Sequence, residues 1–464
     1  MQETGMNVAI VGAGAVSLLT AYELVLSNKV ARIVIFDKPE NSIASATYAA
    51  GAMEAVIGEV EHGFEQDQFQ LKLIENGLMV RHRWDQIDEE IGLNLFTADE
   101  TIVFLNEGAN DFEKKNYQAV VNAAEKFDGF EFVNPNEYFC TSNIKPKESV
   151  IKLKRERAFD PRVMIKRLRE KLIFSGTEFK NEEVISIDPN SKEIQTSMSV
   201  YPGHLYDYII ISAGASSSNL FPEETGIVPL IHGIGTALLC KSEKYTDFVR
   251  PRTVYRSVNR GGSQCGLHLV PNTESEFYIG AGNQLSWNSD KSYRFDTIRY
   301  LMNELEDDLF GASSMYSIKG DILRGNRARS ADYLPLVGPL SVNSDIIFAT
   351  GFNRIGLTMA PLIAGDVLNF IKGKTATYFS GYLPDRELVS YGEIATSSNS
   401  FAEVTCANLI EHNLLEDTGV QSKKQELVQL GYDLNKKANI AFDLPDTFGH
   451  TPDALSVLAK YVKK

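Results

Sequence analysis

Residues 8–17 read Val-Ala-Ile-Val-Gly-Ala-Gly-Ala-Val-Ser, and residues 33–38 read Ile-Val-Ile-Phe-Asp-Lys. An amphipathic run joins them, so the stretch predicts a strand, a glycine-rich turn, a helix and a second strand that ends on an acid. Gly12 permits the tight turn, and Gly14 lets the main chain approach a pyrophosphate. The helix that follows would point its free N–H groups and the positive end of its dipole at that charge. The stretch therefore predicts a unit that binds a dinucleotide.

Two further residues support this interpretation. Asp37 lies 23 residues beyond Gly14, where the carboxylate at the end of the second strand would meet a ribose hydroxyl. Ser17 replaces the third glycine of the usual fingerprint, and it is small enough for the helix to pack closely on the strand. The alternative, an ordinary strand–helix–strand turn without a ligand, is disfavoured because the unit is complete.

Composition narrows the class of protein. The chain has 464 residues, which is too long for one hydrophobic core and predicts two or three domains. With 46 basic and 61 acidic residues the formal charge is −15, which argues against nucleic acid or an anionic membrane as a main partner. No apolar stretch reaches the ~18 residues that span a membrane, and the N-terminus carries no cleavable signal pattern. A cytoplasmic protein is the resulting expectation.

The cysteines form no recognisable metal or redox motif. The chain contains four of them, Cys140, Cys240, Cys265 and Cys406, and no two form a CxxC pair. The spacing therefore predicts neither a zinc ribbon nor a dithiol redox pair, and no metal site is expected. Such sparse and scattered use fits a reducing compartment.

Glycines end three apolar, strand-like runs, near residues 12, 214 and 351. The second and third runs are nearly continuous, as expected for strands buried on both faces of a parallel sheet. Two β-rich segments separate the runs, so the sheet is predicted to be assembled from distant parts of the chain. We expect a mixed α/β (α+β) fold in which residues 1–60, 155–228 and 325–374 form a Rossmann-like domain. Residues 61–154 and 229–324 would form an interleaved antiparallel-β domain for the substrate, and residues 375–464 a helical C-terminal extension.

Six pieces of the sequence, taken in order, resemble a known family. They are Gly12-Ala-Gly-Ala-Val-Ser17, Ser45-Ala-Thr-Tyr-Ala-Ala-Gly51, Phe159-Asp-Pro-Arg162, Ile211-Ser-Ala-Gly214, Gly325-Asn-Arg327 with Asp332-Tyr-Leu-Pro-Leu-Val-Gly338, and Gly351-Phe-Asn-Arg-Ile-Gly-Leu-Thr358. This series is similar to the FAD-dependent D-amino acid oxidase superfamily, nearest in pattern to its glycine and sarcosine oxidase branch. The resemblance covers about residues 6–374 and implies that the dinucleotide is FAD.

The resemblance also implies a set of cofactor-binding residues. The segment 45–51 is rich in small residues, so its backbone would run against the isoalloxazine ring. Residues 356–358 open a helix whose N-terminus would stabilise negative charge at the flavin N1–C2 edge. Some sarcosine oxidases tether FAD through a cysteine that residues 320–340 lack, so non-covalent FAD is expected. The implied residues are Gly12, Ala13, Gly14, Ala15, Val16, Ser17, Asp37, Lys38, Ser45, Thr47, Ala49, Ala50, Gly51, Val184, Ala213, Gly214, Arg354, Ile355, Gly356, Leu357 and Thr358.

Two arginines indicate the substrate class. Arg327 matches the family arginine before the Asp-x-x-Pro-x-x-Gly segment, and Arg354 resembles a second arginine found in some branches. A guanidinium binds a carboxylate through a bidentate fork, so either would hold an α-amino acid with its Cα–H over flavin N5. The alternative is that both arginines form structural ion pairs with the many acids of the chain.

Weaker candidates accompany these arginines. His268 falls near a position where glycine oxidases carry a pocket tyrosine. It would donate a hydrogen bond to the carboxylate, set substrate size, or be an ordinary strand histidine. Met53 would line the pocket or simply pack. Glu59 and His62 are the candidates for catalytic groups.

Together, these features predict an FAD-dependent enzyme that dehydrogenates a free or N-substituted α-amino acid. Hydride would pass from Cα to flavin N5, the imine would hydrolyse to a 2-oxo acid, and oxygen would accept the electrons. Two alternatives stay open: a dehydrogenase of a 2-hydroxy acid or biosynthetic intermediate with a non-oxygen acceptor, and a non-catalytic flavin-binding subunit. The extension has no counterpart in the family pattern. It would cap the structure, shield the entrance or join copies into a homo-oligomer.

Overall fold

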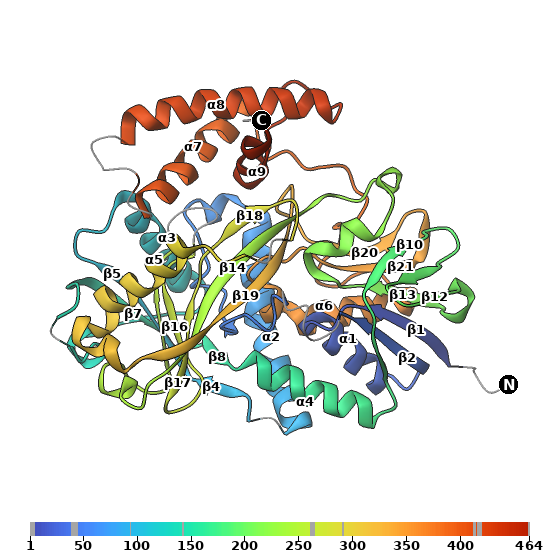
Figure 1. Ribbon diagram of the computed structural model, residues 1–464, viewed down its shortest axis with the longest axis horizontal. Helices are drawn as coiled ribbons and strands as arrows, with labels where there is room; N and C mark the ends of the chain where they lie inside the picture. The colour runs from blue at the N-terminus through green and yellow to red at the C-terminus, as the bar shows by residue number, and fades with distance from the viewer. Residues whose placement is uncertain are drawn as a thin grey trace.

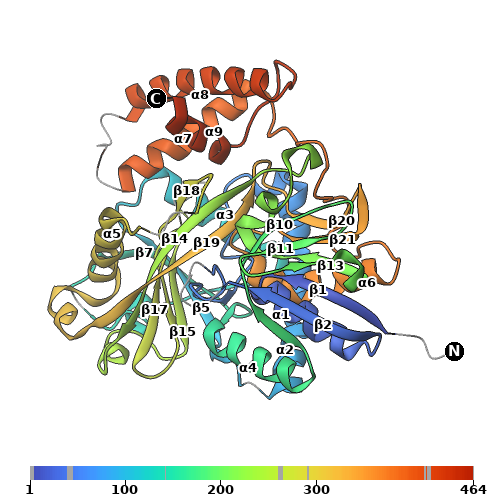
Figure 2. The same ribbon diagram turned by 45° about the vertical axis from the view of Figure 1, so that its right-hand side comes forward.

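The computed structural model describes residues 5–38, 45–92, 94–141, 143–259, 265–289, 292–411, 414 and 420–462. A parallel sheet lies at the right of Figure 1 and a mostly antiparallel sheet at its left. The helices of the C-terminal extension lie at the top of both views (Figures 1 and 2). The mixed α/β fold predicted from the sequence is confirmed.

The first sheet has six strands in the order β20-β21-β13-β1-β2-β9. All neighbouring pairs are parallel except β20 with β21. The strands are β1 (Met6–Val11), β2 (Val30–Asp37), β9 (Glu178–Asn181), β13 (Tyr208–Ile211), β20 (Leu336–Leu340) and β21 (Asn343–Thr350). Helix α1 (Ala15–Leu26) packs against α4 (Pro161–Phe174) and α6 (Gly356–Ile371).

The central strands of this sheet are buried on both faces. In β1, Val8 and Ile10 join the core that contains α1 and α6, whereas Ala9 and Val11 join the core on the opposite face. Because side chains alternate along a strand, consecutive buried residues such as Val8–Val11 are all apolar. Since β1, β13 and β21 are parallel neighbours, the glycine-containing turns after them meet at one edge of the sheet.

The second sheet has nine strands, in the order β18-β14-β17-β16-β15-β5-β7-β6, with β19 paired to β14. The pairs are antiparallel except β15 with β5. The strands are β5 (Glu100–Asn106), β6 (Glu131–Phe132), β7 (Lys147–Leu153), β14 (Leu230–Lys241), β15 (Thr253–Ser257), β16 (His268–Pro271), β17 (Glu276–Gly280), β18 (Gln284–Ser286) and β19 (Lys319–Ser330). Strand β19 pairs with β14 along its whole length, so residues 325–330 lie in this sheet, a difference from the domain boundary expected at residue 325.

Smaller elements complete the body of the molecule. One three-stranded sheet comprises β10 (Val184–Ile187), β11 (Ile194–Thr196) and β12 (Val200–Tyr201), and another comprises β3 (Met53–Glu54), β8 (Arg157–Phe159) and β4 (Phe96–Ala98). Further helices are α2 (Gln68–Ile91), α3 (Asp111–Phe127) and α5 (Phe295–Leu305). Helix α2 packs on α6 through the same core as α1.

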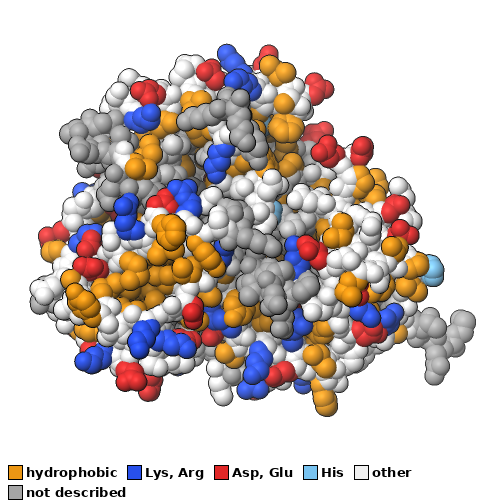
Figure 3. Space-filling view, in the orientation of Figure 1, with side chains coloured by type: hydrophobic (Ala, Val, Ile, Leu, Met, Phe, Trp, Pro, Cys, Tyr) orange, Lys and Arg blue, Asp and Glu red, His pale blue; other side chains and the backbone are white. Residues whose placement is uncertain are grey.

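The described residues of the extension form the helices α7 (Ile394–Glu411), α8 (Val420–Ala441) and α9 (Pro452–Val462). Ala454 and Val457 of α9 pack with Leu285 of β18 and Ile231 of β14, which fixes the extension to the second sheet. On the face seen in Figure 3, acidic and basic side chains are interspersed among apolar ones. None of the described helices is both long enough and apolar enough to cross a membrane.

Candidate active site

A cavity of about 1130 Å³ is lined by residues from both large sheets. This volume exceeds the roughly 300–1,000 Å³ of most small-molecule pockets, so the cavity can hold a large ligand. One end is lined by the glycine turn after β1, and the other by side chains of β15, β16, β17 and β19.

The glycine turn has the conformation that its sequence predicts. The N–H of Gly12 donates to the carbonyl of Phe36 at 2.8 Å, and the residue has a φ of +105°. A Cβ on Gly12 would lie 2.6 Å from the carbonyl oxygen of Ser212, so a side chain has no room. The first hydrogen bond within α1 joins the Leu18 N–H to the Gly14 carbonyl. The N–H groups before residue 18 thus precede the helical ladder at the positive end of the dipole.

Ser17, at the third-glycine position, has a further structural role. Its side chain is completely buried, and its hydroxyl lies 2.6 Å from the hydroxyl of Ser212. This hydrogen bond ties the first turn of α1 to the end of β13. The serine therefore replaces close glycine packing with a specific polar contact.

The end of β2 supplies a carboxylate to the cavity. Asp37 lies 3.5 Å from the guanidinium of Arg169 on α4, and both residues line the cavity. Burial raises the pKa of Asp37, and the neighbouring Arg169 opposes this shift. Lys38, Val184, Ala213 and Gly214 line the same end. Arg169 was missed in the sequence because no local motif marks it.

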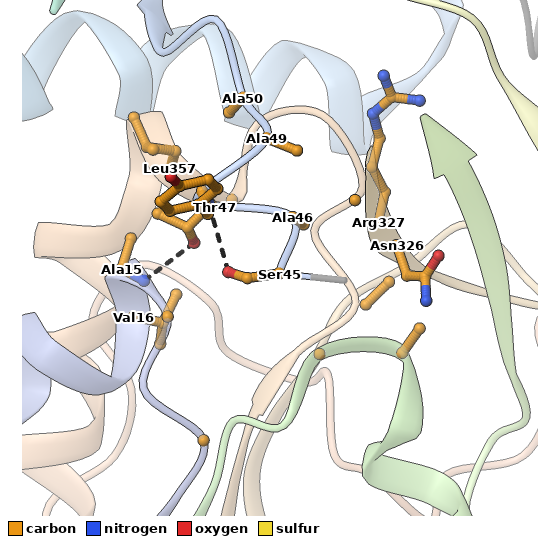
Figure 4. A pocket seen from close by; sticks show the side chains of 18 of the residues that line it. Ala15, Val16, Ser45, Ala46, Thr47, Ala49, Ala50, Asn326, Arg327 and Leu357 are labelled. Carbon is orange, nitrogen blue, oxygen red and sulfur yellow. Dashed lines mark hydrogen bonds between the residues drawn. The ribbon is translucent and has the colours of Figure 1, made fainter. Parts of the chain in front are cut away.

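The small-residue segment 45–51 lines the cavity. Figure 4 shows residues 45–50 between the start of α1 and the strand that carries Asn326 and Arg327. The Thr47 hydroxyl accepts a hydrogen bond from the Ala15 N–H at 3.1 Å, which fixes the segment to α1. A Cβ on Gly325 would lie 2.9 Å from the backbone of Ala46, so the two chains approach closely. Apart from Tyr48, the side chains of this segment are short, so they take up little of the cavity.

A second helix begins at the cavity. The first hydrogen bond within α6 joins the Met359 N–H to the Ile355 carbonyl, so the N–H groups of residues 356–358 precede the helical ladder. Gly356 and Leu357 line the cavity. The Thr358 hydroxyl instead donates to the Met53 carbonyl at 3.2 Å and is buried away from solvent. The N-termini of α1 and α6, the positive ends of two helix dipoles, thus both line the cavity.

Arg327 enters the cavity from β19. Its guanidinium donates to the Asn283 side-chain oxygen at 3.1 Å and to the Gly282 carbonyl at 3.3 Å. Within the described residues, no carboxylate oxygen lies within 4.0 Å of it, in contrast to the other cavity-lining arginines. Arg327 therefore has a full positive charge available to a ligand.

Arg354 has a different environment. Its guanidinium lies 2.6 Å from a Glu61 oxygen and 3.3 Å from a Glu59 oxygen, and it donates to the Asn259 side chain at 3.0 Å. Glu59 also pairs with Arg256 of β15 at 3.0 Å. Burial disfavours the charge on Glu59, but Arg256 and Arg354 outweigh it and lower the pKa of Glu59 to about 2. These residues form a buried ion cluster beside the cavity.

His268 and Tyr278 form one wall of the cavity. Their rings are stacked, with centroids 5.6 Å apart. Burial lowers the pKa of His268 to about 3, so the ring is neutral near pH 7. Its Nδ1 lies 3.2 Å from the Gly266 carbonyl, which assigns the proton to Nδ1 and leaves Nε2 as an acceptor. His268 is therefore suited to receive a hydrogen bond from an amine rather than to donate one to a carboxylate.

Two weaker candidates have clear positions. Met53 lines the cavity and packs against the cluster that contains Tyr278. His62 is exposed and is not among the residues that line the cavity, because its side chain leaves the turn toward solvent. Of the two catalytic candidates, only Glu59 lines the cavity.

The sequence missed Arg256, Asn259 and Tyr278, which also line the substrate end. They lie on or beside interior strands of the second sheet. A single polar residue within an apolar run belongs to no recognisable sequence motif, so it is not identified from the sequence. The pairing of Arg256 with His268 across β15 and β16 places them together, but this register cannot be read from local sequence. One signal was available: a charged residue inside the β-rich run 253–257.

Acidification should destabilise the protein through His268. The unfolded chain would bind a proton on this residue below pH 6.5, whereas the folded chain would do so only near pH 3. Stability is therefore lost as pH falls through this window, by about 2 kcal/mol at pH 5. We expect the Tm of the His268→Asn variant to decrease less between pH 7 and pH 5 than the Tm of the parent, as measured by thermal unfolding. Equal losses in both proteins would contradict the buried neutral state.

A family model described as "FAD dependent oxidoreductase" (DAO) matches residues 7–368. The structure resembles glycine oxidase from Geobacillus kaustophilus, with a TM-score of 0.69 and 16% identity over 83% of this chain and 99% of that one. It also resembles L-proline dehydrogenase from P. horikoshii, with a TM-score of 0.64 and 18% identity over 82% of this chain and 97% of that one. At these identities, the similarity to both structures shows a common fold.

One curated relative is similar in sequence. The chain is 20% identical over 420 residues to YhfW of Bacillus subtilis (strain 168), a protein named for a Rieske 2Fe-2S iron-sulfur centre. The match covers 83% of this chain and 72% of that protein. Within the described residues of this chain, no group of three or more His, Cys, Asp or Glu side chains is placed to hold a metal ion.

Proposed function

This chain belongs to the family of FAD-dependent oxidoreductases, and from that premise we propose that it dehydrogenates a free or N-substituted α-amino acid, with oxygen as the electron acceptor. One observation supports the substrate class above the others. Among the residues that the structure describes, four arginines line the cavity, Arg169, Arg256, Arg327 and Arg354, and three of them pair with carboxylates. Arg327 alone among these four has only neutral partners in the described chain. A substrate carboxylate would supply the missing charge.

The cavity fits FAD. The glycine turn and the first turn of α1 would hold the diphosphate, and Asp37 would accept hydrogen bonds from the ribose. Residues 45–51 leave space for the flavin ring, and the N–H groups at the start of α6 favour negative charge beside it. When bound, FAD supplies a flavin N5 that accepts hydride from the substrate Cα. The resulting imine would hydrolyse to a 2-oxo acid.

The side chains at the substrate end would bind and orient. Arg327 would hold the carboxylate through two N–H groups, which fixes the direction of the Cα–H bond. Nε2 of the neutral His268 would accept a hydrogen bond from the amine. Arg354 is already paired with two carboxylates. We therefore propose that it forms part of the wall of the site and does not bind the substrate carboxylate directly. An amine that binds in its neutral form needs no additional base.

The proposal is tested by a substrate panel under anaerobic conditions. Holoenzyme is mixed with D-, L- and N-methyl amino acids and with the matching 2-hydroxy acids, and loss of the flavin's visible absorbance is recorded. Bleaching by at least one amino acid, followed by peroxide release when oxygen is admitted, is the expected result. Bleaching by 2-hydroxy acids alone would show that the substrate is a 2-hydroxy acid and not an amino acid. Bleaching by amino acids without oxygen uptake would support the substrate class but contradict oxygen as the electron acceptor.

Substitution of Gly235 should weaken substrate binding because it displaces Arg327. A Cβ on Gly235 would lie 2.8 Å from a guanidinium nitrogen of Arg327, so the flexible arginine has to move. A displacement of about 1 Å can cost about 100-fold in rate, and we expect Gly235→Ala to raise KM by about 10- to 100-fold. Steady-state kinetics measure the effect. Gly365→Ala is the matched control, because a Cβ there meets no atom within 4 Å and KM should not change.

A further inference from the structure

Helix α9 of the C-terminal extension packs on strand β18 of the second sheet. The helix lies beyond residue 368, where the family match ends. Leu285 of β18 is buried against Ala454 and Val457 of α9. The Lys460 side chain of α9 also donates a hydrogen bond to the Leu285 carbonyl. The helix therefore holds both the side chain and the backbone of this strand residue.

The segment just before Leu285 supplies hydrogen-bond acceptors to Arg327. The guanidinium donates to the Gly282 carbonyl at 3.3 Å and to the Asn283 side-chain oxygen at 3.1 Å. The Gly282 N–H in turn donates to the Thr236 carbonyl of β14 at 2.9 Å, so this segment continues the pairing of β18 with β14. The acceptors of Arg327 thus lie two and three residues from the contact with α9.

The register of the second sheet places Leu285 and Arg327 in one row. Gly233 of β14 is paired with Leu285 on one side and with Arg327 on the other. Directly paired residues point to the same face of a sheet, so α9 packs on the face from which Arg327 extends. A Cβ on Gly233 would lie 3.2 Å from the Asn283 side-chain oxygen and 3.4 Å from the Cβ of Arg327. The Asn283 side chain therefore lies over Gly233, beside the arginine that it binds.

A second set of contacts joins α9 to β19, the strand that carries Arg327. The buried carboxylate of Asp453 lies 2.8 Å from the guanidinium of Arg329. The Thr451 hydroxyl, just before α9, donates to the Ala331 carbonyl at 2.8 Å. Because side chains alternate along a strand, Arg329 and Arg327 lie on the same face of β19. One helix thus contacts both the strand of Arg327 and the strand next to its hydrogen-bond acceptors.

We propose that α9 positions Arg327 for its ligand, because the contacts of α9 with Leu285 fix the segment that carries the acceptors of the guanidinium. Val457 and Lys460 are then positioning residues, since neither is among the described residues that line the cavity. The proposal rests on the proposed function only in that the ligand of Arg327 is a carboxylate. This role differs from the three that the sequence predicted for the extension.

The first test compares two buried valines by steady-state kinetics of the holoenzyme. Val457→Ala loosens the packing on Leu285, so Arg327 should shift by a fraction of an ångström. Since a shift of about 1 Å can cost about 100-fold, we expect KM for the best amino acid to rise by about 3- to 10-fold. The value of kcat should stay within about twofold of the parent, because Arg327 binds the substrate and does not react with it.

The control for this variant is Val249→Ala. Val249 is as fully buried as Val457, but it belongs to a different hydrophobic core. Its replacement should lower Tm by a similar amount and leave KM unchanged. A parental KM in V457A, or an equal rise of KM in V249A, would overturn the proposal.

The second test removes the hydrogen bond to the Leu285 carbonyl. Lys460→Met keeps the apolar part of the side chain and removes the donor, so KM should rise by about threefold. Lys460→Arg keeps a donor and should return KM to within about 1.5-fold of the parent. The control is Lys424→Met, which breaks an ion pair with Glu403 inside the extension and should leave KM unchanged. Equal KM values in K460M and K424M, or no rescue by arginine, would contradict the proposal.

A measurement without substrate separates this proposal from the proposed function. Hydrogen exchange of the Gly282 amide, which donates to the Thr236 carbonyl, is followed in the substrate-free holoenzyme. Local opening speeds exchange, so V457A and K460M should each exchange this amide about threefold faster than V249A and K424M. Because no substrate is present, the result is independent of whether any amino acid is oxidised. Equal exchange rates in all four variants would refute the coupling of α9 to the segment that binds Arg327.

Discussion

Replacement of Gly12 with alanine is expected to give a protein that purifies without bound FAD. Gly12 has a φ of +105°, and a Cβ would lie 2.6 Å from the carbonyl oxygen of Ser212, a backbone atom that cannot rotate away. The turn would open, and the N–H groups at the start of α1 would move away from the diphosphate. We expect FAD affinity to fall by about 100-fold or more, which corresponds to about 3 kcal/mol. The flavin content of the purified protein and titration of the apoprotein with FAD measure it.

The control for Gly12 is Gly63→Ala. Gly63 also has a positive φ, of +94°, but a Cβ there meets no atom within 4 Å, and the residue does not line the cavity. This variant should lose some Tm through backbone strain and keep its FAD. If G12A retains FAD as well as G63A does, the glycine turn is not the main determinant of cofactor binding.

Replacement of Arg327 with methionine should raise KM for the best amino acid by about 30- to 1,000-fold while the flavin spectrum stays normal. Methionine keeps much of the side chain's volume and removes the one cavity-lining guanidinium that lacks a carboxylate partner in the described chain. Loss of a buried charge-assisted contact costs about 2–4 kcal/mol, which corresponds to this range. Steady-state kinetics and anaerobic titration of the flavin with substrate measure it.

Arg169→Met is the matched variant at the other end of the cavity. Arg169 pairs with Asp37, far from the substrate end, so this change should weaken FAD binding and leave KM nearly constant. Comparison of the R327M and R169M variants would then distinguish effects on substrate binding from effects on cofactor binding. If R327M leaves KM unchanged for every accepted amino acid, the substrate carboxylate binds elsewhere, and Arg354 becomes the first residue to test.

Much of the fold could be predicted from the sequence, because its signals are local. The glycine turn, the helix that follows it and the apolar runs of β13 and β21 each follow from neighbouring residues, and the order of the sequence motifs indicated the family. The pairing of β19 with β14 joins residues about 90 positions apart. Strand pairing at such distances has no local signal.

The charges of the site could not be predicted in the same way. Two arginines were proposed to meet a carboxylate, but their partners are distant in sequence: Glu59 and Glu61 are almost 300 residues before Arg354. Only the folded chain distinguishes an arginine already paired with acids from one with neutral partners. The neutral state of His268 likewise follows from its burial, which a strand pattern does not quantify.

The assembly of the parallel sheet has a consequence for biosynthesis. Strand β1 pairs with β13, about 200 residues later, and β13 pairs with β21, which ends at Thr350. The nascent chain therefore cannot complete this sheet until about three quarters of it has been translated. Until then the apolar strands are exposed to aggregation, and folding is slowed by closure of very long loops. Fragments that end before residue 350 should thus depend on chaperones and fail to fold as independent units.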